Sequence, residues 1–573
     1  MDTPRRLFLK QSGLAATAVS LFPSEVFSQA AGGGLGSDEL LKMLTEINDE
    51  LIEGLISQQV SLPGERWDGG VADRFEVLNI NSTLGFAGRL AISYSSPSSR
   101  YYLSSRLEGP MDQAMACVLK VQHEDGTTDL HTTNFHSTPD AAFLVNYISP
   151  IFVNLTRLAR PGLLGVTGKM EQFLRNAGKA LAVGGIHTPN HRWVVCSALA
   201  RVNALFPSQA YVDRIDDWLG EGIDIDPDGQ FTEQSVSIYS PICDTMFLTI
   251  GRLLKRDELM DIVRRNLDMT LYYIQPGGEV LTDASGRQDS ARIGYIANYY
   301  YAYRYFALKD GNPVYAAVCR LIENLMPERI VRYVPELLES PELLEELPVA
   351  SKIPDNYAKR FAHSGVFRIR SGDADLSVIE ENPTFMSFMK GASVLQSIRL
   401  AAAFFGSRGM FISEGAEWSG RTVVLTKSHT HGYYQPFPED ERTPDGDMEK
   451  MPREKRAMSE LQTLDYRVEV TESKGKVSID IRIEGTPHVP VSMEMSFRSG
   501  GQLSGVVADK NLAGSHFLEN GMGQYTQGDD VITFGPGIAE HKWAEIRGML
   551  PKQKGESVYL TGFTPFRHTL HLE

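Results

Sequence analysis

Cysteine is scarce in this chain of 573 residues. Its four cysteines, Cys117, Cys196, Cys243 and Cys319, form no CxxC pair, and each lies in an apolar stretch with helical spacing. A disulfide framework or a cysteine zinc site would need a recognisable spacing pattern. We therefore expect four buried free thiols, which behave as small hydrophobic side chains.

Positive charge is also in short supply. The chain has 56 Lys and Arg against 72 Asp and Glu, a formal net charge of −16. A phosphate backbone or an anionic lipid surface would repel such a protein, so we expect no nucleic acid and no membrane insertion. An acidic enzyme that acts on an acidic sugar would need a local basic lining to offset this field.

The apolar run from Gly13 to Phe22 is too short to span a bilayer. It follows Arg5-Arg6-Leu7-Phe8-Leu9-Lys10 and precedes the small residues of Ser28-Gln29-Ala30. This order is typical of a twin-arginine signal peptide. We therefore assign residues 1–30 to a signal peptide and expect export to the periplasm.

Periodicity divides the rest of the chain. Residues 37–325 contain many amphipathic stretches joined by Gly, Pro and Asp turns, which predicts helix pairs wound into a ring or stack. Residues 326–360 include the acidic run PELLESPELLEELP, which we interpret as a solvated linker, with partner docking as the alternative. Residues 361–573 alternate apolar and polar positions between turns, which predicts an antiparallel β-sandwich. Residues 393–405 break this alternation and could form a short helix.

The stretch Ile186-His-Thr-Pro-Asn-His-Arg-Trp193 predicts the start of a helix. Thr188 suits the N-cap and Pro189 the first helical position, where a missing N–H costs nothing. Asn190 and His191 then lie in the first turn, where free N–H groups and the helix dipole favour an anion. An amide and an imidazole there could hold a carboxylate. The alternative is that both are polar residues on a solvated helix end.

A second segment, Asp226-Pro-Asp-Gly-Gln-Phe-Thr-Glu-Gln-Ser235, opens with a strong turn signal. Ser240 and Pro241 then suit the N-cap and first residue of a helix over 242–254. Tyr239 would lie just before that helix, on the loop side, where functional side chains are often placed. An ordinary half-buried aromatic is the alternative for Tyr239.

An Asn-His pair at a helix start, a DG-x-F-x-E turn and a Tyr about fifty residues after the pair resemble the heparinase II/III-like and alginate-lyase-like polysaccharide lyases. SGVFRIRSGDADL, at residues 364–376, resembles the opening of their β-sandwich. The resemblance implies an N-terminal (α/α) toroid followed by an antiparallel β-sandwich, and cleavage at a uronic acid by β-elimination. It assigns the substrate carboxylate to Asn190 and His191, and acid–base chemistry to Tyr239. Among finer activities, the sequence is most similar to the L-rhamnose-α-1,4-D-glucuronate lyases.

Three further groups could bind an acidic glycan. Arg287 and Arg292 could each grip a carboxylate, or pair with Asp289 or another neighbour. Asn134 and His136 precede a helix that begins near Pro139, as rim residues or as plain turn and cap residues. His429 and His431 share one face of an extended strand, as a zinc pair or a base on the sandwich side. No cofactor is required by this chemistry, and a structural divalent metal stays open.

Two other functions compete with the lyase. A toroidal glycoside hydrolase would need a carboxylate pair, for which Asp226, Asp228, Glu233 and Asp283 are available. A non-catalytic carbohydrate-binding protein would share the fold, and fold alone does not choose between the three.

Overall fold

The computed structural model describes residues 36–406 and 409–573. The predicted signal peptide, with Arg5 and Arg6, lies outside these residues. The chain divides into two compact units. Within the described residues, one unit comprises 36–370 and 377–382, and the other comprises 371–376 and 383–573.

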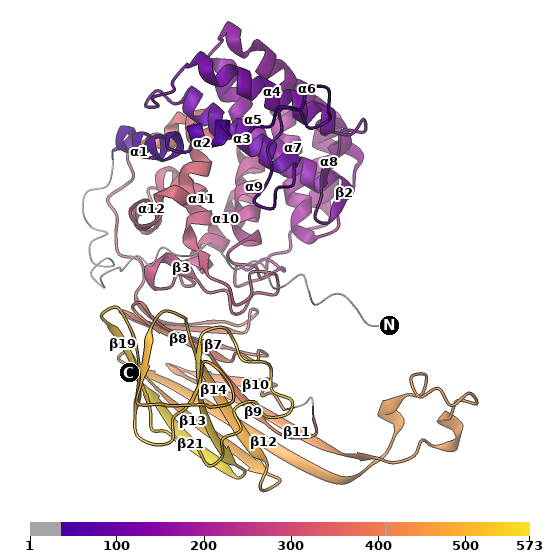
Figure 1. The fold of residues 1–573 in the computed structure, drawn as a ribbon, viewed down its shortest axis with the longest axis vertical. Helices are drawn as coiled ribbons and strands as arrows, with labels where there is room; N and C mark the ends of the chain where they lie inside the picture. Colours follow the sequence, from indigo (N-terminus) through magenta and orange to yellow (C-terminus); the bar gives the residue numbers. More distant parts are fainter. Residues whose placement is uncertain (1–35, 407–408) are drawn as a thin grey trace. The chain divides into compact units, whose positions relative to one another are not determined.

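The first unit is built from helix pairs (Figure 1). An inner set of helices is mostly buried: α3 (Ile80–Ser95), α5 (Thr138–Arg157), α7 (Pro189–Leu205), α9 (Tyr239–Leu254) and α11 (Tyr300–Lys309). Outer helices alternate with them: α4 (Glu108–Val121), α6 (Leu164–Val183), α8 (Gln209–Gly220), α10 (Asp257–Thr270) and α12 (Pro313–Leu325). The helices α1 (Ser37–Asp49) and α2 (Ile52–Ile56) precede them. Each inner helix packs against the next, from α3 to α11. This confirms the predicted (α/α) toroid.

One antiparallel outer helix separates each inner helix from the next, so the inner helices run in the same direction. Their N-termini therefore meet at one end of the toroid. The segments that lead into them are residues 57–79, 122–137, 184–188, 221–238 and 271–299. We call these five segments the inner-helix loops. They contain Asn134, His136, Arg287 and Arg292, and they lead directly into the first turns that hold Asn190, His191 and Tyr239.

Local capping explains where several of these helices begin. The Asn79 side chain accepts a hydrogen bond from the Ser82 N–H at 2.8 Å, and that of Ser137 accepts one from the Asp140 N–H at 3.2 Å. The Asn312 side chain caps α12 in the same way. Such side chains satisfy N–H groups that a helix start otherwise leaves unpaired.

Residues 327–347 differ from the solvated linker that their charge predicts. They form α13 (Pro327–Ile330), a 3₁₀ turn over Val331–Tyr333, α14 (Val334–Glu339) and a second 3₁₀ turn over Pro341–Leu344. Val334 and Leu337 are buried in the core of the toroid, and Asn154 Nδ2 on α5 donates a hydrogen bond to the Pro335 carbonyl at 2.8 Å. The apolar side chains of this stretch therefore hold it on the toroid although its surface is acidic.

The second region is a β-sandwich, as predicted. One sheet has the order β10-β11-β12-β13-β21-β19-β18-β15, and the other has the order β16-β17-β20-β14-β9-β8-β7-β6-β5. Neighbouring strands are antiparallel in the registers described, except that β17 and β20 are parallel. The strands of the first sheet are β10 (Gly415–Ser419), β11 (Thr422–Tyr434), β12 (Met458–Ser473), β13 (Lys476–Gly485), β15 (Gln502–Ser504), β18 (Gly523–Gln527), β19 (Asp530–Gly535) and β21 (Phe566–Leu572).

The strands of the second sheet are β5 (Asn356–Phe361), β6 (Val366–Ser371), β7 (Ala374–Ile379), β8 (Met386–Lys390), β9 (Ser393–Ala402), β14 (Pro490–Phe497), β16 (Val507–Ala508), β17 (Ser515–Phe517) and β20 (Glu556–Phe563). The stretch that the sequence left open is strand β9. Nine of its ten residues are buried, on both faces of the strand. A strand covered on both faces loses the alternation that identifies a half-buried strand.

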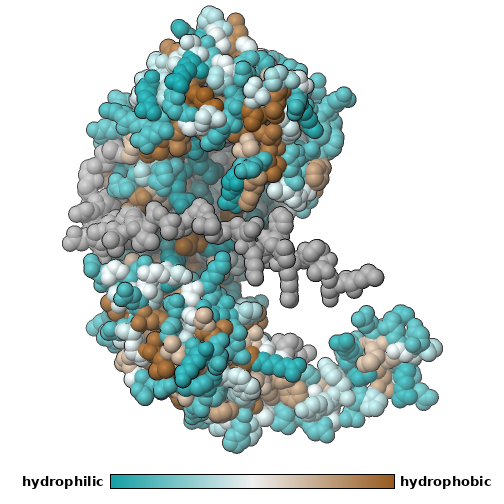
Figure 2. All heavy atoms as spheres, in the orientation of Figure 1, coloured by the Kyte–Doolittle hydropathy of each residue, from teal (hydrophilic) through white to brown (hydrophobic). Residues whose placement is uncertain are grey.

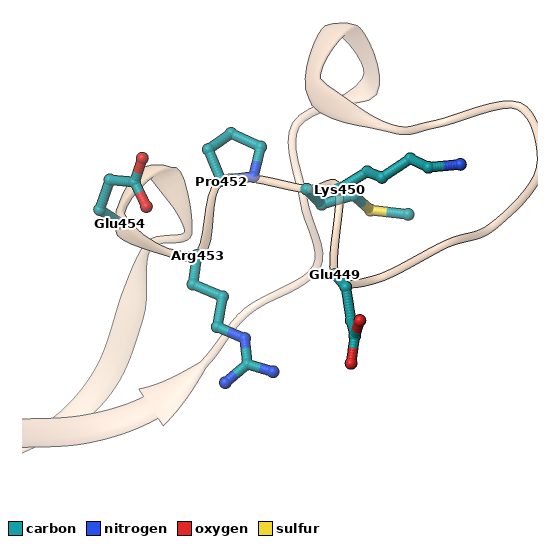
Figure 3. A pocket seen from close by; sticks show the side chains of 6 residues that line it. Glu449, Lys450, Pro452, Arg453 and Glu454 are labelled. Carbon is teal, nitrogen blue, oxygen red and sulfur yellow. The ribbon is translucent and has the colours of Figure 1, made fainter. Parts of the chain in front are cut away.

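The strands β11 and β12 continue beyond their sheet neighbours as a two-stranded ribbon whose tip spans residues 435–457 (Figure 1). The tip is largely hydrophilic (Figure 2) and is held by ion pairs such as Lys450–Asp445 at 2.9 Å. A hollow of about 510 Å³ lies at this tip. Figure 3 shows Lys450 pointing away from Glu449 and Arg453. The hollow is lined by residues 449–454, none of which the sequence marks as functional.

All four cysteines are buried and free, as their apolar surroundings in the sequence predict. Among the described residues, no helix is both long enough and apolar enough to cross a bilayer.

Candidate active site

The helix α7 begins at Pro189 with Thr188 at the N-cap, as predicted, although the Thr188 hydroxyl does not cap it. Instead the hydroxyl donates to Asn190 Oδ1 at 3.1 Å. Asn190 and His191 are only 1% and 8% exposed, so they are not polar residues on a solvated helix end. Asn190 Nδ2 and His191 Nδ1 are buried and have no hydrogen-bond partner among the described residues. Buried polar atoms are normally satisfied, so these two atoms of consecutive residues are available to hydrogen-bond a ligand.

His191 is uncharged at neutral pH. Burial, together with the nearby His187 and Arg287 and against the opposing effect of Asp140, lowers the pKa of its imidazole to about 4. The rings of His187 and His191 meet edge to face, with centroids 4.6 Å apart. His191 would therefore meet a substrate carboxylate as a neutral hydrogen-bonding group, and positive charge has to come from another residue.

The turn at residues 226–229 positions Glu233 against the start of α7. Gly229 has a φ of +97°, and a Cβ there would lie 2.6 Å from the Arg265 carbonyl, so glycine is required. Glu233 is buried, and its Oε2 accepts a hydrogen bond from the Asn190 backbone N–H at 3.2 Å. Burial raises the pKa of this carboxyl, while Arg287 opposes the shift.

Tyr239 is the first residue of α9 and not the last residue of the loop, so the helix begins earlier than the Ser240-Pro241 signal predicted. The Tyr239 backbone N–H donates to Ser235 Oγ at 3.2 Å. Its ring is half-buried, and Gln288 Nε2 donates to its hydroxyl oxygen at 2.5 Å. The Arg287 guanidinium carbon lies 5.2 Å from the ring centroid. The phenol is thus held by two consecutive residues of one inner-helix loop.

The structure distinguishes the two candidate arginines. Arg287 Nε lies 3.4 Å from Glu233 Oε1, so one guanidinium links Glu233 with Tyr239. Arg292 is exposed, and its described hydrogen bonds are those of its backbone. Both lie in a loop ahead of the 3₁₀ turn Ile296–Tyr299 and not at a helix start. Asp289 accepts hydrogen bonds from Ser237 and Ser285 instead of pairing with either arginine.

Asn134 and His136 lie in β2 (Asn134–Ser137), which pairs with β1 (Thr128–Leu130) just before α5. Asn134 Nδ2 donates to Asp140 Oδ2 at 2.8 Å, and Asp140 acts electrostatically on His191. His136 Nδ1 lies 2.8 Å from Asp125 Oδ2, and its ring stacks on His123. Asn134 is therefore linked to the α7 start through Asp140, whereas the described contacts of His136 lie within its own hairpin loop.

His429 and His431 share one face of β11, as predicted, with ring centroids 6.1 Å apart. His431 is buried, packs on Phe405 and accepts the Gly432 N–H at Nδ1. Within the residues that the structure describes, no group of three or more His, Cys, Asp or Glu could hold a metal ion. Both histidines belong to the sandwich unit.

Asp226 and Asp228, two of the carboxylates that a hydrolase could use, have structural contacts. Asp226 Oδ1 accepts the Gln230 N–H at 2.9 Å and closes the turn. Asp228 Oδ2 accepts the His363 N–H at 2.6 Å. The backbone carbonyl of Asp283 accepts a hydrogen bond from Asn382 Nδ2 at 3.1 Å. Of the four, Glu233 is the carboxylate that contacts Asn190 and Arg287.

Known structures share this architecture. The chain superposes on Paenibacillus xanthan lyase with a TM-score of 0.58 and 10% sequence identity, over 96% of this chain and 59% of that one. It also superposes on the Streptomyces coelicolor A3 chondroitin AC lyase in complex with chondroitin sulphate, with a TM-score of 0.52 and 12% sequence identity. This match covers 96% of this chain and 82% of that one. The chain has the fold of these polysaccharide lyases. This confirms the fold that the sequence resemblance implies, although the chain spans less than two thirds of the xanthan lyase. No protein-family model and no curated protein matches the sequence.

Two residues of this site escape a linear inspection of the sequence. Glu233 is part of the turn motif, but its contacts with Asn190 and Arg287 join two inner-helix loops and the first turn of α7. Gln288 follows Arg287 directly and carries no motif of its own, yet it holds the Tyr239 hydroxyl. Only the convergence of the inner helices brings these side chains together.

Proposed function

We propose that this protein is a lyase that cleaves a glycosidic bond at a uronic acid, in particular glucuronate, by β-elimination. The observation that supports this proposal is the pair of buried, unsatisfied atoms Asn190 Nδ2 and His191 Nδ1 beside Arg287 and Tyr239. These groups suit an acidic sugar, because an amide and an imidazole can share its carboxylate while a guanidinium supplies charge.

The chemistry requires three things of the site. The bond between C5 and its hydrogen breaks, and its electrons form a double bond to C4 as the bond from C4 to the leaving oxygen breaks. Negative charge that develops next to the carboxylate has to be stabilised, which hydrogen-bond donors at fixed positions do. One group takes the C5 proton, and one group protonates the leaving oxygen.

Asn190 and His191 are suited to stabilising the negative charge next to the carboxylate, because the inner helix and its buried surroundings fix both side chains before substrate binds. Arg287 adds the positive charge that neutral His191 does not supply. Glu233 positions both Asn190 and Arg287. One of its carboxylate oxygens accepts a hydrogen bond from the Asn190 backbone N–H, and the other lies near the Arg287 guanidinium.

Tyr239 is suited to proton transfer at both C5 and the leaving oxygen when these lie on one face of the sugar. Gln288 fixes the phenol oxygen at one point, and the Arg287 charge lies over the ring, where it offsets negative charge on that oxygen. No metal or cofactor is needed for these steps. From the predicted signal peptide we further propose that the enzyme works in the periplasm.

The product decides between the proposed function and its rivals. Elimination leaves an unsaturated uronate that absorbs ultraviolet light, hydrolysis leaves a saturated sugar with a new reducing end, and a binding protein leaves the glycan intact. We would incubate the protein with glucuronate, mannuronate and galacturonate glycans, including one whose glucuronate is capped by rhamnose. Reducing ends without ultraviolet absorbance would favour the hydrolase and refute the lyase.

A further inference from the structure

The inner-helix loops are strongly acidic. Residues 57–79 contain four Asp or Glu and two Arg, and residues 122–137 contain three Asp or Glu and no Arg. Residues 184–188 have no charged residue besides His187, residues 221–238 contain five Asp or Glu and no Arg, and residues 271–299 contain three Asp or Glu and two Arg. None of the five segments contains Lys. The end of the toroid that carries the candidate site is thus more acidic than basic by a wide margin.

Positive charge next to the candidate residues is equally limited. Arg287 contacts both Glu233 and the Tyr239 ring, and the carboxylate of Glu233 already offsets part of its charge. His191 is uncharged at neutral pH, because its pKa is about 4. Arg292 is the other arginine of this loop and is exposed. The candidate residues therefore offer a substrate two positive charges at most, one of which Glu233 already offsets in part.

We propose that the substrate is an unsulfated uronate glycan, in which the carboxylates are the only charged groups. This inference rests on the proposed lyase function. Each sulfate would add a permanent negative charge close to the acidic loops, and a pairing of like charges disfavours the wrong partner. An electrostatic field of one sign at a binding surface changes association rates by about 10- to 1,000-fold. Here the negative field would slow the association of a polysulfated chain.

The test compares two forms of one backbone. The unsulfated form is the glycan that gives unsaturated product in the substrate screen, and its partner is the same glycan after chemical sulfation. We expect kcat/KM to be at least about tenfold higher for the unsulfated form. Raising the salt concentration should lower the ratio of the two kcat/KM values, since the Debye length falls from about 10 Å at 0.1 M to about 3 Å at 1 M.

The outcomes separate this inference from the proposed function. Absence of unsaturated product from every glycan would refute the lyase itself. Unsaturated product that forms as fast from the sulfated form as from the unsulfated one would overturn only the inference about sulfate.

A pair of charge reversals tests whether the inner-helix loops cause the preference. Glu124 is exposed in one of these loops, whereas Glu258 is exposed in the first turn of α10, at the opposite end of the toroid. Glu124→Lys and Glu258→Lys have the same net charge. Glu124→Lys should raise the rate on the sulfated glycan relative to the unsulfated one, and Glu258→Lys should leave the ratio at the wild-type value. Equal effects of the two variants, or no effect of either, would contradict an origin in these loops.

Discussion

Replacing Tyr239 by Phe separates catalysis from folding more cleanly than any other single change. It removes one hydroxyl and one hydrogen bond, the 2.5 Å contact from Gln288 Nε2. Because Gln288 is exposed, water can replace the lost partner, and the free energy of unfolding should fall by no more than about 0.5–1.5 kcal/mol. The ring keeps its packing and its contact with Arg287.

Activity should respond far more strongly, because the phenol is the proposed group for proton transfer. Loss of one general acid–base group lowers turnover by about 100-fold or more, which corresponds to about 2.7 kcal/mol of barrier at 1.36 kcal/mol for each factor of ten. The assay follows unsaturated product by ultraviolet absorbance on the best glycan of the screen, together with a thermal melt of the variant.

Tyr315→Phe is the matched control. Tyr315 lies on α12 and is 2% exposed. Its hydroxyl donates a hydrogen bond to Asp268 Oδ1 at 2.6 Å. This variant should lose at least as much stability as Tyr239→Phe, because water replaces a buried partner less readily, but it should keep wild-type turnover. A Tyr239→Phe enzyme that forms unsaturated product at the wild-type rate would falsify the assignment of Tyr239.

Three other predictions concern charged residues. Arg287→Ala should lower kcat/KM on a uronate glycan by an amount that corresponds to about 2–5 kcal/mol, while Arg292→Ala should change it little; equal effects would contradict the site described. Burial raises the pKa of Asp244 well above its usual value, so folding takes up a proton and stability falls as pH rises from about 4, the usual value, toward the raised one. Asp244→Asn should flatten this part of the curve of unfolding free energy against pH, and a slope equal to that of wild type would exclude Asp244 as its cause. Replacing Arg5 and Arg6 by Lys should leave the protein in the cytoplasm, and undiminished periplasmic protein after fractionation would argue against twin-arginine export.

The start of α7 could be predicted because its signal is local. Thr188 and Pro189 are adjacent in sequence, and the helix begins at Pro189 in the structure. The start of α9 was misplaced because Pro fits any position of the first turn, where the N–H is unpaired in any case. Pro241 therefore marks the region of the helix start but does not fix its first residue, which is Tyr239.

Longer-range features were beyond a local inspection of the sequence. The stretch 326–360 resembles a linker because of its acidic, proline-containing run PELLESPELLEELP, yet Val334 and Leu337 are buried in the core of the toroid. The burial of Asn190 was also not predictable, because it depends on α7 being surrounded by α5, α6, α8 and α9. A sequence pattern shows which residues share a helix face, but not how many neighbours cover that helix.

Some of the buried polar groups without a described partner lie on the inner helices. Asn190 and His191 lie at the start of α7, and Asp244 lies on α9 with both oxygens buried and without a hydrogen-bond partner among the described residues. Each such group costs free energy of folding. At Asn190 and His191 a substrate carboxylate would recover that cost on binding, because its oxygens accept the hydrogen bonds that the protein leaves open. Asp244 is fully buried, and no such recovery is open to it, so we expect its ionisation to lower the stability of the fold at high pH.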